Sequence, residues 1–181
     1  VNPPPEKAEA VELFSLILNV CNTVYPDYGK VSGGFCGESP DEVAFVEAAW
    51  HIGYRLMDRT PTGLVEISRD FGQNCSPKSD SYQTLLCFPF DSDRKRMSVV
   101  VRVRDKTMVL TKGADSTILP LCRAQTDSDV LERSEQFLAM HASRGLRTLC
   151  LAARTLSPEE EEMVIQEADR LKGAVDGGVG L

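Results

Sequence analysis

Hydrophobic and polar residues recur with two different periods along the chain, and clear breaks separate the segments. Near the N-terminus the apolar residues fall three or four positions apart, as on one face of a helix: Val11, Phe14, Ile17 and Leu18. Glutamates precede them, which favours the N-terminal end of a helix. The pattern predicts an amphipathic helix that starts within residues 3–22.

The segment "ESPDEVAFVEAAWHIG" predicts the start of a second helix. Ser39 can serve as the N-cap, Pro40 as the first helical residue and Glu42 as the reciprocal partner of the cap. Gly53 is expected to end this helix after Trp50, because glycine readily adopts the left-handed conformation that follows a helix.

The middle of the chain changes to strand signals. Residues 54–67 predict a hairpin, with Leu56 and Val65 in its strands and the turn at Pro61 to Gly63. The segments on either side of this helix and hairpin, residues 23–37 and 68–81, have the composition of loops.

The strongest strand candidates are residues 82–90 and 96–104, and the second alternates at Val99, Val101 and Val103. A turn at Asp105 and Lys106 leads into a further strand that ends near residue 113. Connections this short join antiparallel neighbours, so we expect an antiparallel meander.

The last third returns to helical spacing. Residues 127–143 predict a helix, 145–156 form an apolar run expected to be a central strand, and 157–173 predict a terminal helix. The fold class is therefore α+β, a mainly antiparallel sheet flanked by helices. We expect one domain over residues 1–181, with residues 173–181 as a flexible end.

Charge, cysteine content and hydrophobicity limit the kinds of partner and cellular environment to expect for this chain. The 20 basic and 27 acidic residues give a net charge of −7, which disfavours a nucleic-acid partner. The six cysteines form no CxxC pair and have no histidine at ligand spacing, so we expect buried free thiols in a reducing compartment. No apolar stretch approaches the roughly 20 residues that span a bilayer. The absence of an initiator methionine and the glycine-rich tail suggest a piece of a longer protein.

Common catalytic motifs are missing. The chain has no P-loop, no GxGxxG and no GxSxG, and neither histidine has a serine or cysteine nucleophile at a recognisable spacing. Composition and spacing alone would leave a soluble α+β domain without an assigned activity.

Four separated segments carry a resemblance: "GESPDE", "FPFDSDRKRMSVVV", "LTKGADSTIL" and "ASRGLRTLCLAAR". Their order and spacing resemble the nucleotide-binding domain of P-type ATPases, and most of all the type IV subfamily, the phospholipid-translocating ATPases or flippases. The likeness runs from about residue 11 to residue 156. It departs from the family at Asn22, where a histidine is common.

The resemblance implies an ATP site. Phe90 occupies the position whose aromatic ring stacks on adenine, and Lys112 that of the lysine lining the adenine pocket. Gly113 beside it would allow a ligand to approach the backbone closely. From the residues alone, Phe90 would be assigned to the core, and Lys112 could be a solvated strand end.

Further site positions come from the other motifs. Arg147 would reach the ribose and phosphates, Leu149 would pack against the base, and Ser92 occupies a motif position between Phe90 and the basic triplet. Arg147 could instead be a simple surface charge. Glu42 would accept a hydrogen bond near the adenine amino group, or it could only cap its helix, as the similar "SPEE" at residues 157–160 suggests.

The resemblance also implies what lies outside the chain. The phosphorylation motif "DKTGT" is absent, so the chain would bind ATP without hydrolysing it. Its ATP would meet Mg²⁺ and the acceptor aspartate in a separate phosphorylation domain. Expected partners are the phosphorylation, actuator and membrane domains of the parent protein, an accessory subunit, and a phospholipid bound elsewhere. The domain would lie at the cytosolic face of a membrane.

Two other functions compete with this one. The chain could be a flippase-like regulatory module that has lost nucleotide use and serves as an interaction surface. Alternatively, a set of basic residues could form a face for anionic lipid or nucleic acid: Arg94, Lys95, Arg96, Arg102, Arg104 and Lys106.

Overall fold

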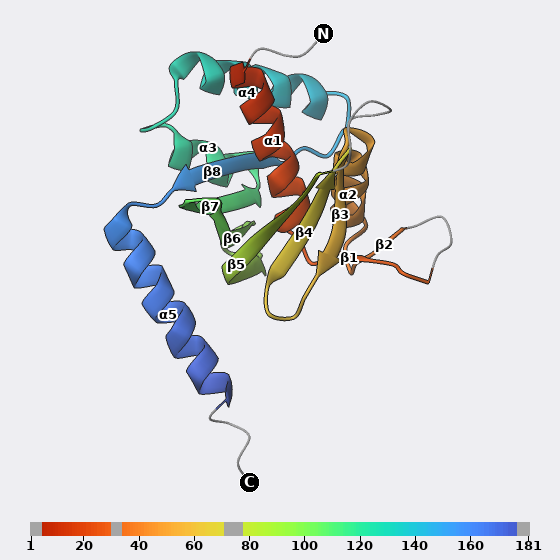
Figure 1. Cartoon of the computed structure of the whole chain (residues 1–181). Helices are drawn as coiled ribbons and strands as arrows, with labels where there is room; N and C mark the ends of the chain where they lie inside the picture. The colour runs from red at the N-terminus through yellow and green to blue at the C-terminus, as the bar shows by residue number, and fades with distance from the viewer. Residues whose placement is uncertain (1–4, 30–33, 71–77, 177–181) are drawn as a thin grey trace.

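Residues 5–29, 34–70 and 78–176 are described by a computed structural model, in which helices and strands follow the predicted α+β order (Figure 1). The helices of these residues are α1 (Pro5–Val20), α2 (Pro40–His51), α3 (Asp115–Cys122), α4 (Ser128–Ala142) and α5 (Pro158–Asp176). The strands are β1 (Tyr25–Pro26), β2 (Phe35–Cys36), β3 (Tyr54–Arg59), β4 (Leu64–Arg69), β5 (Lys78–Asp91), β6 (Arg96–Val103), β7 (Lys106–Gly113) and β8 (Cys150–Thr155).

The main sheet is a six-stranded antiparallel meander in the order β3-β4-β5-β6-β7-β8, which confirms the predicted fold class. β1 and β2 pair separately within the segment expected to be a loop. The prediction of a central strand over residues 145–156 was wrong, because β8 pairs only with β7 and forms an edge. Besides β7, the helices α3 and α1 pack against this strand.

The polar segment at residues 68–81 is also more ordered than its composition predicted. β4 extends to Arg69 and β5 begins at Lys78, so both ends of this segment pair with each other. An ion pair of 2.6 Å between Arg69 and Asp80 joins the two strands. The intervening residues 71–77 lie outside the described structure.

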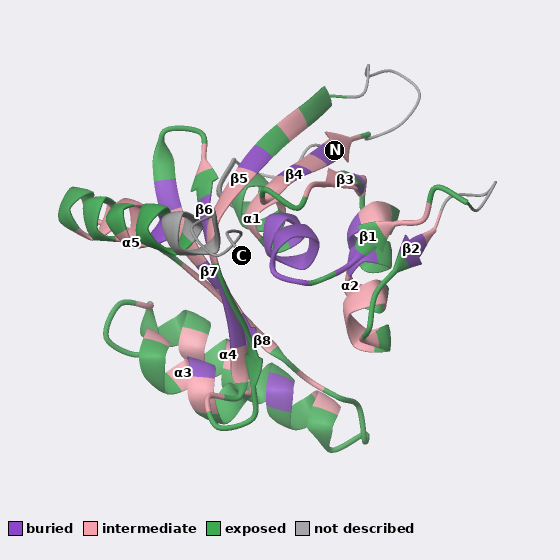
Figure 2. Ribbon diagram, turned by 90° about the horizontal axis from the view of Figure 1, so that it is seen from below, coloured by how far each residue is buried: buried purple, intermediate pink, exposed green. Residues whose placement is uncertain are grey.

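α1 supplies much of the core. Figure 2 shows the buried turns of this helix between the sheet and α2. Its buried part is the second half, where Ile17 and Leu18 are 3% and 5% exposed. Val11 and Phe14 were predicted to share that face but are 43% and 48% exposed, because the sheet and α2 enclose the later turns of the helix.

The structure confirms most of the local sequence signals at α2, the β3–β4 hairpin and β6. Ser39 is the N-cap of α2, and Gly53 follows that helix with φ of 94° while donating its N–H to the carbonyl of Trp50. The predicted hairpin is the β3–β4 pair. In β6, Val99 and Val101 enter the core beside α1, as the alternation predicted.

The five cysteines of the described residues are free, as predicted, but only Cys21 is buried, and Cys36 and Cys87 are exposed. Cys75 lies outside the described structure. Among the described residues, no helix is both long and apolar enough to cross a membrane.

Candidate functional site

The four motif segments meet at one cavity of about 250 Å³. It lies where the N-terminus of α2, the ends of β5 and β7, and the extended segment before β8 come together. Six of the seven residues predicted from the sequence line it: Glu42, Phe90, Lys112, Gly113, Arg147 and Leu149. Ser39, Asp41 and Phe45 complete the lining.

Lys112 is the most buried charged group of this cavity. Its residue is only 8% exposed, so the alternative of a solvated strand end is wrong. The ammonium group donates to Oε1 of Glu42 at 2.6 Å, and it lies 5.6 Å from the centre of the Phe45 ring. A carboxylate and an aromatic face thus stabilise a cation at the wall of the cavity.

Glu42 is held by donors on both carboxylate oxygens. Oε1 accepts from Lys112, and Oε2 accepts from the backbone N–H of Thr23 at 2.9 Å and from its hydroxyl at 2.8 Å. Burial opposes ionisation of Glu42, but the hydrogen bonds from Lys112 and Thr23 outweigh it and lower the pKa of the carboxyl below its usual value. Glu42 therefore presents a negative charge at neutral pH.

The expected reciprocal cap between Ser39 and Glu42 is only half formed. The hydroxyl of Ser39 accepts from the backbone N–H of Glu42 at 3.5 Å, but the Glu42 carboxylate is directed to Thr23 and Lys112. The matching motif at α5 behaves as predicted, since the Glu160 carboxylate accepts from the N–H of Ser157 at 2.9 Å. The same motif thus caps one helix fully, while at the other it delivers its carboxylate to the cavity.

Phe90 projects at the end of β5 with 65% of its surface exposed, so the interpretation as a core residue is wrong. The turn that follows is fixed by Asp91, whose carboxylate accepts from the backbone N–H groups of Asp93 at 2.7 Å and Arg94 at 3.1 Å. Ser92 is exposed in this turn and is not among the residues that line the cavity.

Contacts within the protein require glycine at position 113, independently of any ligand. A Cβ atom there would lie 2.6 Å from the carbonyl oxygen of Lys95 and 2.7 Å from Cβ of Arg96. The N–H of Ala114 donates to the same carbonyl of Lys95 at 3.1 Å. The close approach expected at this glycine is therefore made by the turn after Phe90, which rests against the end of β7.

Arg147 and Leu149 lie in the extended segment between α4 and β8. Arg147 is anchored at one point, by an ion pair of 2.7 Å with Asp41, while 81% of its side chain remains exposed. Leu149 is 37% exposed. The segment thus places a solvated guanidinium and an apolar side chain on the wall facing Glu42 and Lys112.

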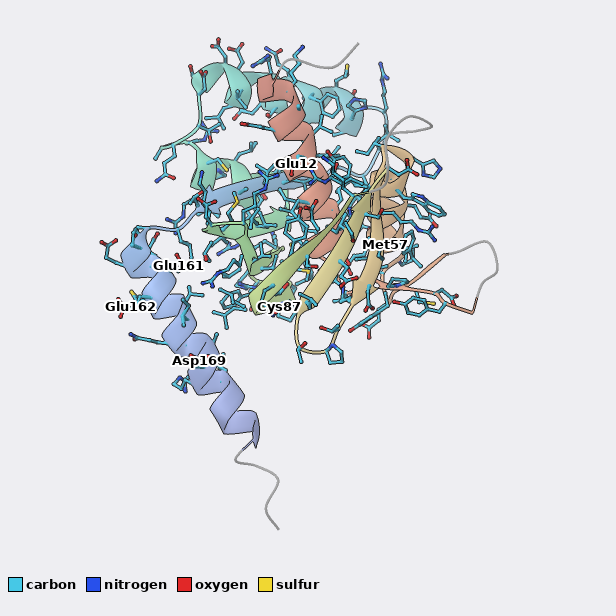
Figure 3. The ribbon with its side chains drawn as sticks, viewed as in Figure 1. Glu12, Met57, Cys87, Glu161, Glu162 and Asp169 are labelled. Carbon is cyan, nitrogen blue, oxygen red and sulfur yellow. The ribbon has the colours of Figure 1, made fainter. Side chains whose placement is uncertain are left out.

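Two arginines of the alternative basic face pair with the domain's own acids. Arg102 forms an ion pair of 2.8 Å with Glu161 of α5, and Arg104 forms one of 2.8 Å with Glu12 of α1; both acids are labelled in Figure 3. In the basic triplet, the Arg94 guanidinium donates to the carbonyl of Pro89 at 2.8 Å.

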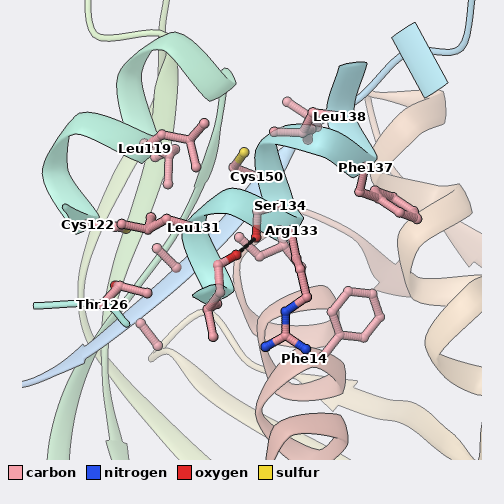
Figure 4. A pocket seen from close by; sticks show the side chains of 16 residues that line it. Phe14, Leu119, Cys122, Thr126, Leu131, Arg133, Ser134, Phe137, Leu138 and Cys150 are labelled. Atoms are coloured by element: carbon pink, nitrogen blue, oxygen red, sulfur yellow. Dashed lines mark hydrogen bonds between the residues drawn. The ribbon is translucent and has the colours of Figure 1, made fainter. Parts of the chain in front are cut away.

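A larger cavity, of about 690 Å³, lies between α1, α3, α4 and β8 (Figure 4). It is lined mainly by apolar side chains such as Leu119, Leu131 and Phe137, and of the predicted site residues it contains only Leu149. The residues with the chemistry for a charged ligand therefore converge at the smaller cavity. Among the described residues, no cluster of three or more His, Cys, Asp or Glu side chains could hold a metal ion.

Sequence reasoning missed Thr23 and Phe45. Phe45 follows Glu42 by three positions on the same helix, so its helical spacing was a usable signal. Thr23 offered none, because it reaches Glu42 through a contact that only the tertiary fold creates.

Comparison with known families identifies the class of domain. The family described as P-type ATPase, cytoplasmic domain N, matches residues 10–175. The chain belongs to this family, as the four motifs predicted.

Within this family, the chain is similar to phospholipid-transporting ATPases. The chain is 40% identical over 159 residues to phospholipid-transporting ATPase C887.12 of Schizosaccharomyces pombe, covering 86% of the chain and 12% of the relative. It is 34% identical to phospholipid-transporting ATPase DNF1 of Chaetomium thermophilum, with 95% and 11% covered. It is also 34% identical to phospholipid-transporting ATPase DRS2 of Saccharomyces cerevisiae, with 89% and 12% covered. The chain thus spans about an eighth of these relatives.

Proposed function

We propose that this domain binds ATP at the cavity between α2, β5, β7 and β8, and presents the γ-phosphate to an aspartate in a separate phosphorylation domain of a phospholipid-transporting P-type ATPase. The observation that carries the proposal is the convergence of Glu42, Phe90, Lys112 and Arg147 from four distant segments on one cavity. The names of the relatives support the transport of phospholipid by the whole protein.

The size of the cavity supports a site for one end of the nucleotide. At about 250 Å³ it lies just below the range of roughly 300–1,000 Å³ typical of pockets for whole drug-sized ligands. The base would stack on the exposed ring of Phe90 and contact Leu149, while Glu42 would accept from the adenine amino group. The ribose and phosphates would then extend toward Arg147 and solvent.

Catalysis would need residues beyond this chain. Phosphoryl transfer depends on positioning and on neutralising the charge of the transferred group. The described residues offer no acidic cluster for Mg²⁺, so the ion would arrive with the triphosphate and be held mainly by the phosphorylation domain. Membrane domains, an actuator domain, an accessory subunit and a place at the cytosolic face of a membrane belong to the same proposal.

The experiment is a titration of the ¹⁵N-labelled chain with ATP. Amide shifts should saturate and concentrate around Phe90, Lys112 and Arg147. Phe90→Ala should weaken binding by on the order of tenfold, because stacking of a base on an aromatic ring is worth about 1–3 kcal/mol. Phe88→Ala is the matched control, since Phe88 is an exposed aromatic of the same strand outside the cavity lining.

Absence of binding at millimolar ATP would contradict the proposal and favour the regulatory module. Equal affinity of the wild type and Phe90→Ala would refute the adenine platform at this residue.

A further inference from the structure

Thr23 makes an unusual double contact with the candidate site. Its backbone N–H and its hydroxyl both donate to Oε2 of Glu42, at 2.9 and 2.8 Å. Oε1 of the same carboxylate accepts from Lys112 at 2.6 Å. A carboxylate oxygen can accept more than one hydrogen bond, so Oε1 keeps capacity for a ligand donor in the cavity.

The position of Thr23 is itself fixed from β3. Arg59 donates to the carbonyl of Asn19 at 2.7 Å, before Thr23, and to the carbonyl of Val24 at 3.0 Å, after it. It also donates to the side-chain oxygen of Asn22 at 3.0 Å, and that oxygen accepts from the N–H of Val24. A largely buried guanidinium thus closes the C-terminal end of α1 and fixes the direction of the chain at Thr23.

The capping motif of α5 shows what the Glu42 carboxylate would do without this contact. Glu160 turns back and accepts from the N–H of Ser157, as the motif predicts. Glu42 has the same motif but is directed away from its cap by the two donors of Thr23 and by Lys112.

We propose that Thr23 is a positioning residue of the nucleotide site, which orients the Glu42 carboxylate and thereby sets the preference for adenine. This inference rests on the proposed function above. Adenine carries an amino group that can donate to Oε1, whereas guanine carries at the same ring position a carbonyl oxygen that would repel it. Thr23 touches neither base, so it acts only through the carboxylate.

The test compares ATP and GTP binding to the wild type and to Thr23→Val, which keeps the shape and the backbone N–H but removes the hydroxyl. Because one donor to Oε2 and the Lys112 bond remain, we expect ATP affinity to fall by about three- to tenfold. GTP affinity should change little, so the ratio of the two affinities falls by the same factor. Thr23→Ser keeps the hydroxyl, so it should retain the wild-type ratio of ATP to GTP affinity.

Two controls separate positioning from general damage. Thr155→Val changes an exposed threonine of β8 outside the cavity lining and should leave both affinities unchanged. In the background of Glu42→Gln, Thr23→Val should have no further effect on the ATP to GTP ratio, since the carboxylate it orients is gone. The thermal midpoint of each variant verifies folding.

Failure of this inference is distinct from failure of the proposed function. If the wild type binds ATP and Thr23→Val binds ATP and GTP with wild-type affinities, the positioning role is refuted and the site stands. A loss of ATP and GTP affinity by the same factor would also refute it. If the wild type binds no nucleotide at millimolar concentration, the proposed function fails and the inference with it.

Discussion

Lys112 and Glu42 stand seventy residues apart in the chain, and their side chains form an ion pair of 2.6 Å while only 9% and 12% exposed. The pair joins the start of α2 to the end of β7. The carboxylate lies in the first turn of its helix, where the helix dipole stabilises negative charge. The same two groups therefore contribute to the fold and to the candidate site.

Lys112→Met should destabilise the domain, because it leaves the largely buried Glu42 carboxylate without its cation. Removing one partner of a buried ion pair typically costs about 3–5 kcal/mol, and the remaining bonds from Thr23 favour the lower end. Urea unfolding measures the change in free energy. Lys106→Met at the exposed start of β7 is the control, and a loss at Lys112 no larger than at Lys106 would show that the pair does not stabilise the fold.

Glu42 should also make stability depend on pH. Its pKa in the folded protein lies below the ordinary value of 4.5, so its contribution to stability is complete above that value. As the pH falls through the lower folded pKa, the folded carboxylate takes up its proton and the contribution is lost. The free energy of unfolding should therefore fall less steeply with acid in Glu42→Gln than in the wild type. Parallel curves below pH 4.5 would contradict this, and Glu47→Gln on the exposed side of α2 is the control.

At the proposed nucleotide site, Asp41 would compete with the ligand for Arg147. The ion pair between them is 2.7 Å long, but it is exposed, and such pairs contribute only about 0–1 kcal/mol to stability. Asp41→Asn should leave the thermal midpoint nearly unchanged and raise ATP affinity by about two- to fivefold, because the guanidinium is freed and a negative charge is removed beside the phosphates.

The control for this substitution is Glu135→Gln, which breaks the exposed 2.8 Å pair with Arg123 outside the cavity lining. Calorimetric titration at two salt concentrations measures both variants. Since exposed charges are screened, the gain at Asp41 should shrink at high salt. An affinity gain of equal size in Glu135→Gln would show that only net charge matters.

The sequence predicted the elements whose signals are local. The Ser39 cap and the β6 alternation each depend on a few neighbouring residues. α3 was missed because it is short and contains Pro120, which weakens any helical pattern. The edge position of β8 was missed because the same apolar run is expected for an edge strand covered by a helix and for a central strand with a neighbour on each side.

Six of the seven site residues expected from the four motifs line one cavity in the structure. What the motifs could not predict is how these residues contact one another. The pairing of Arg147 with Asp41, and the diversion of Glu42 from its cap to Thr23, depend on tertiary contacts between segments far apart in the chain.

Gly113→Ala should disturb both the fold and the site. An added Cβ would meet the carbonyl of Lys95 at 2.6 Å, and neither backbone can move without shifting the turn that follows Phe90. Overpacking of this kind costs about 1–3 kcal/mol, measurable by urea unfolding. Because the displaced turn directly follows Phe90, the proposed adenine platform, ATP affinity should fall as well. Gly29→Ala is the control, since its Cβ would meet only the Asp27 side chain, at 3.3 Å. Wild-type stability and ATP affinity in Gly113→Ala would contradict the claim that the close packing of this turn requires glycine at position 113.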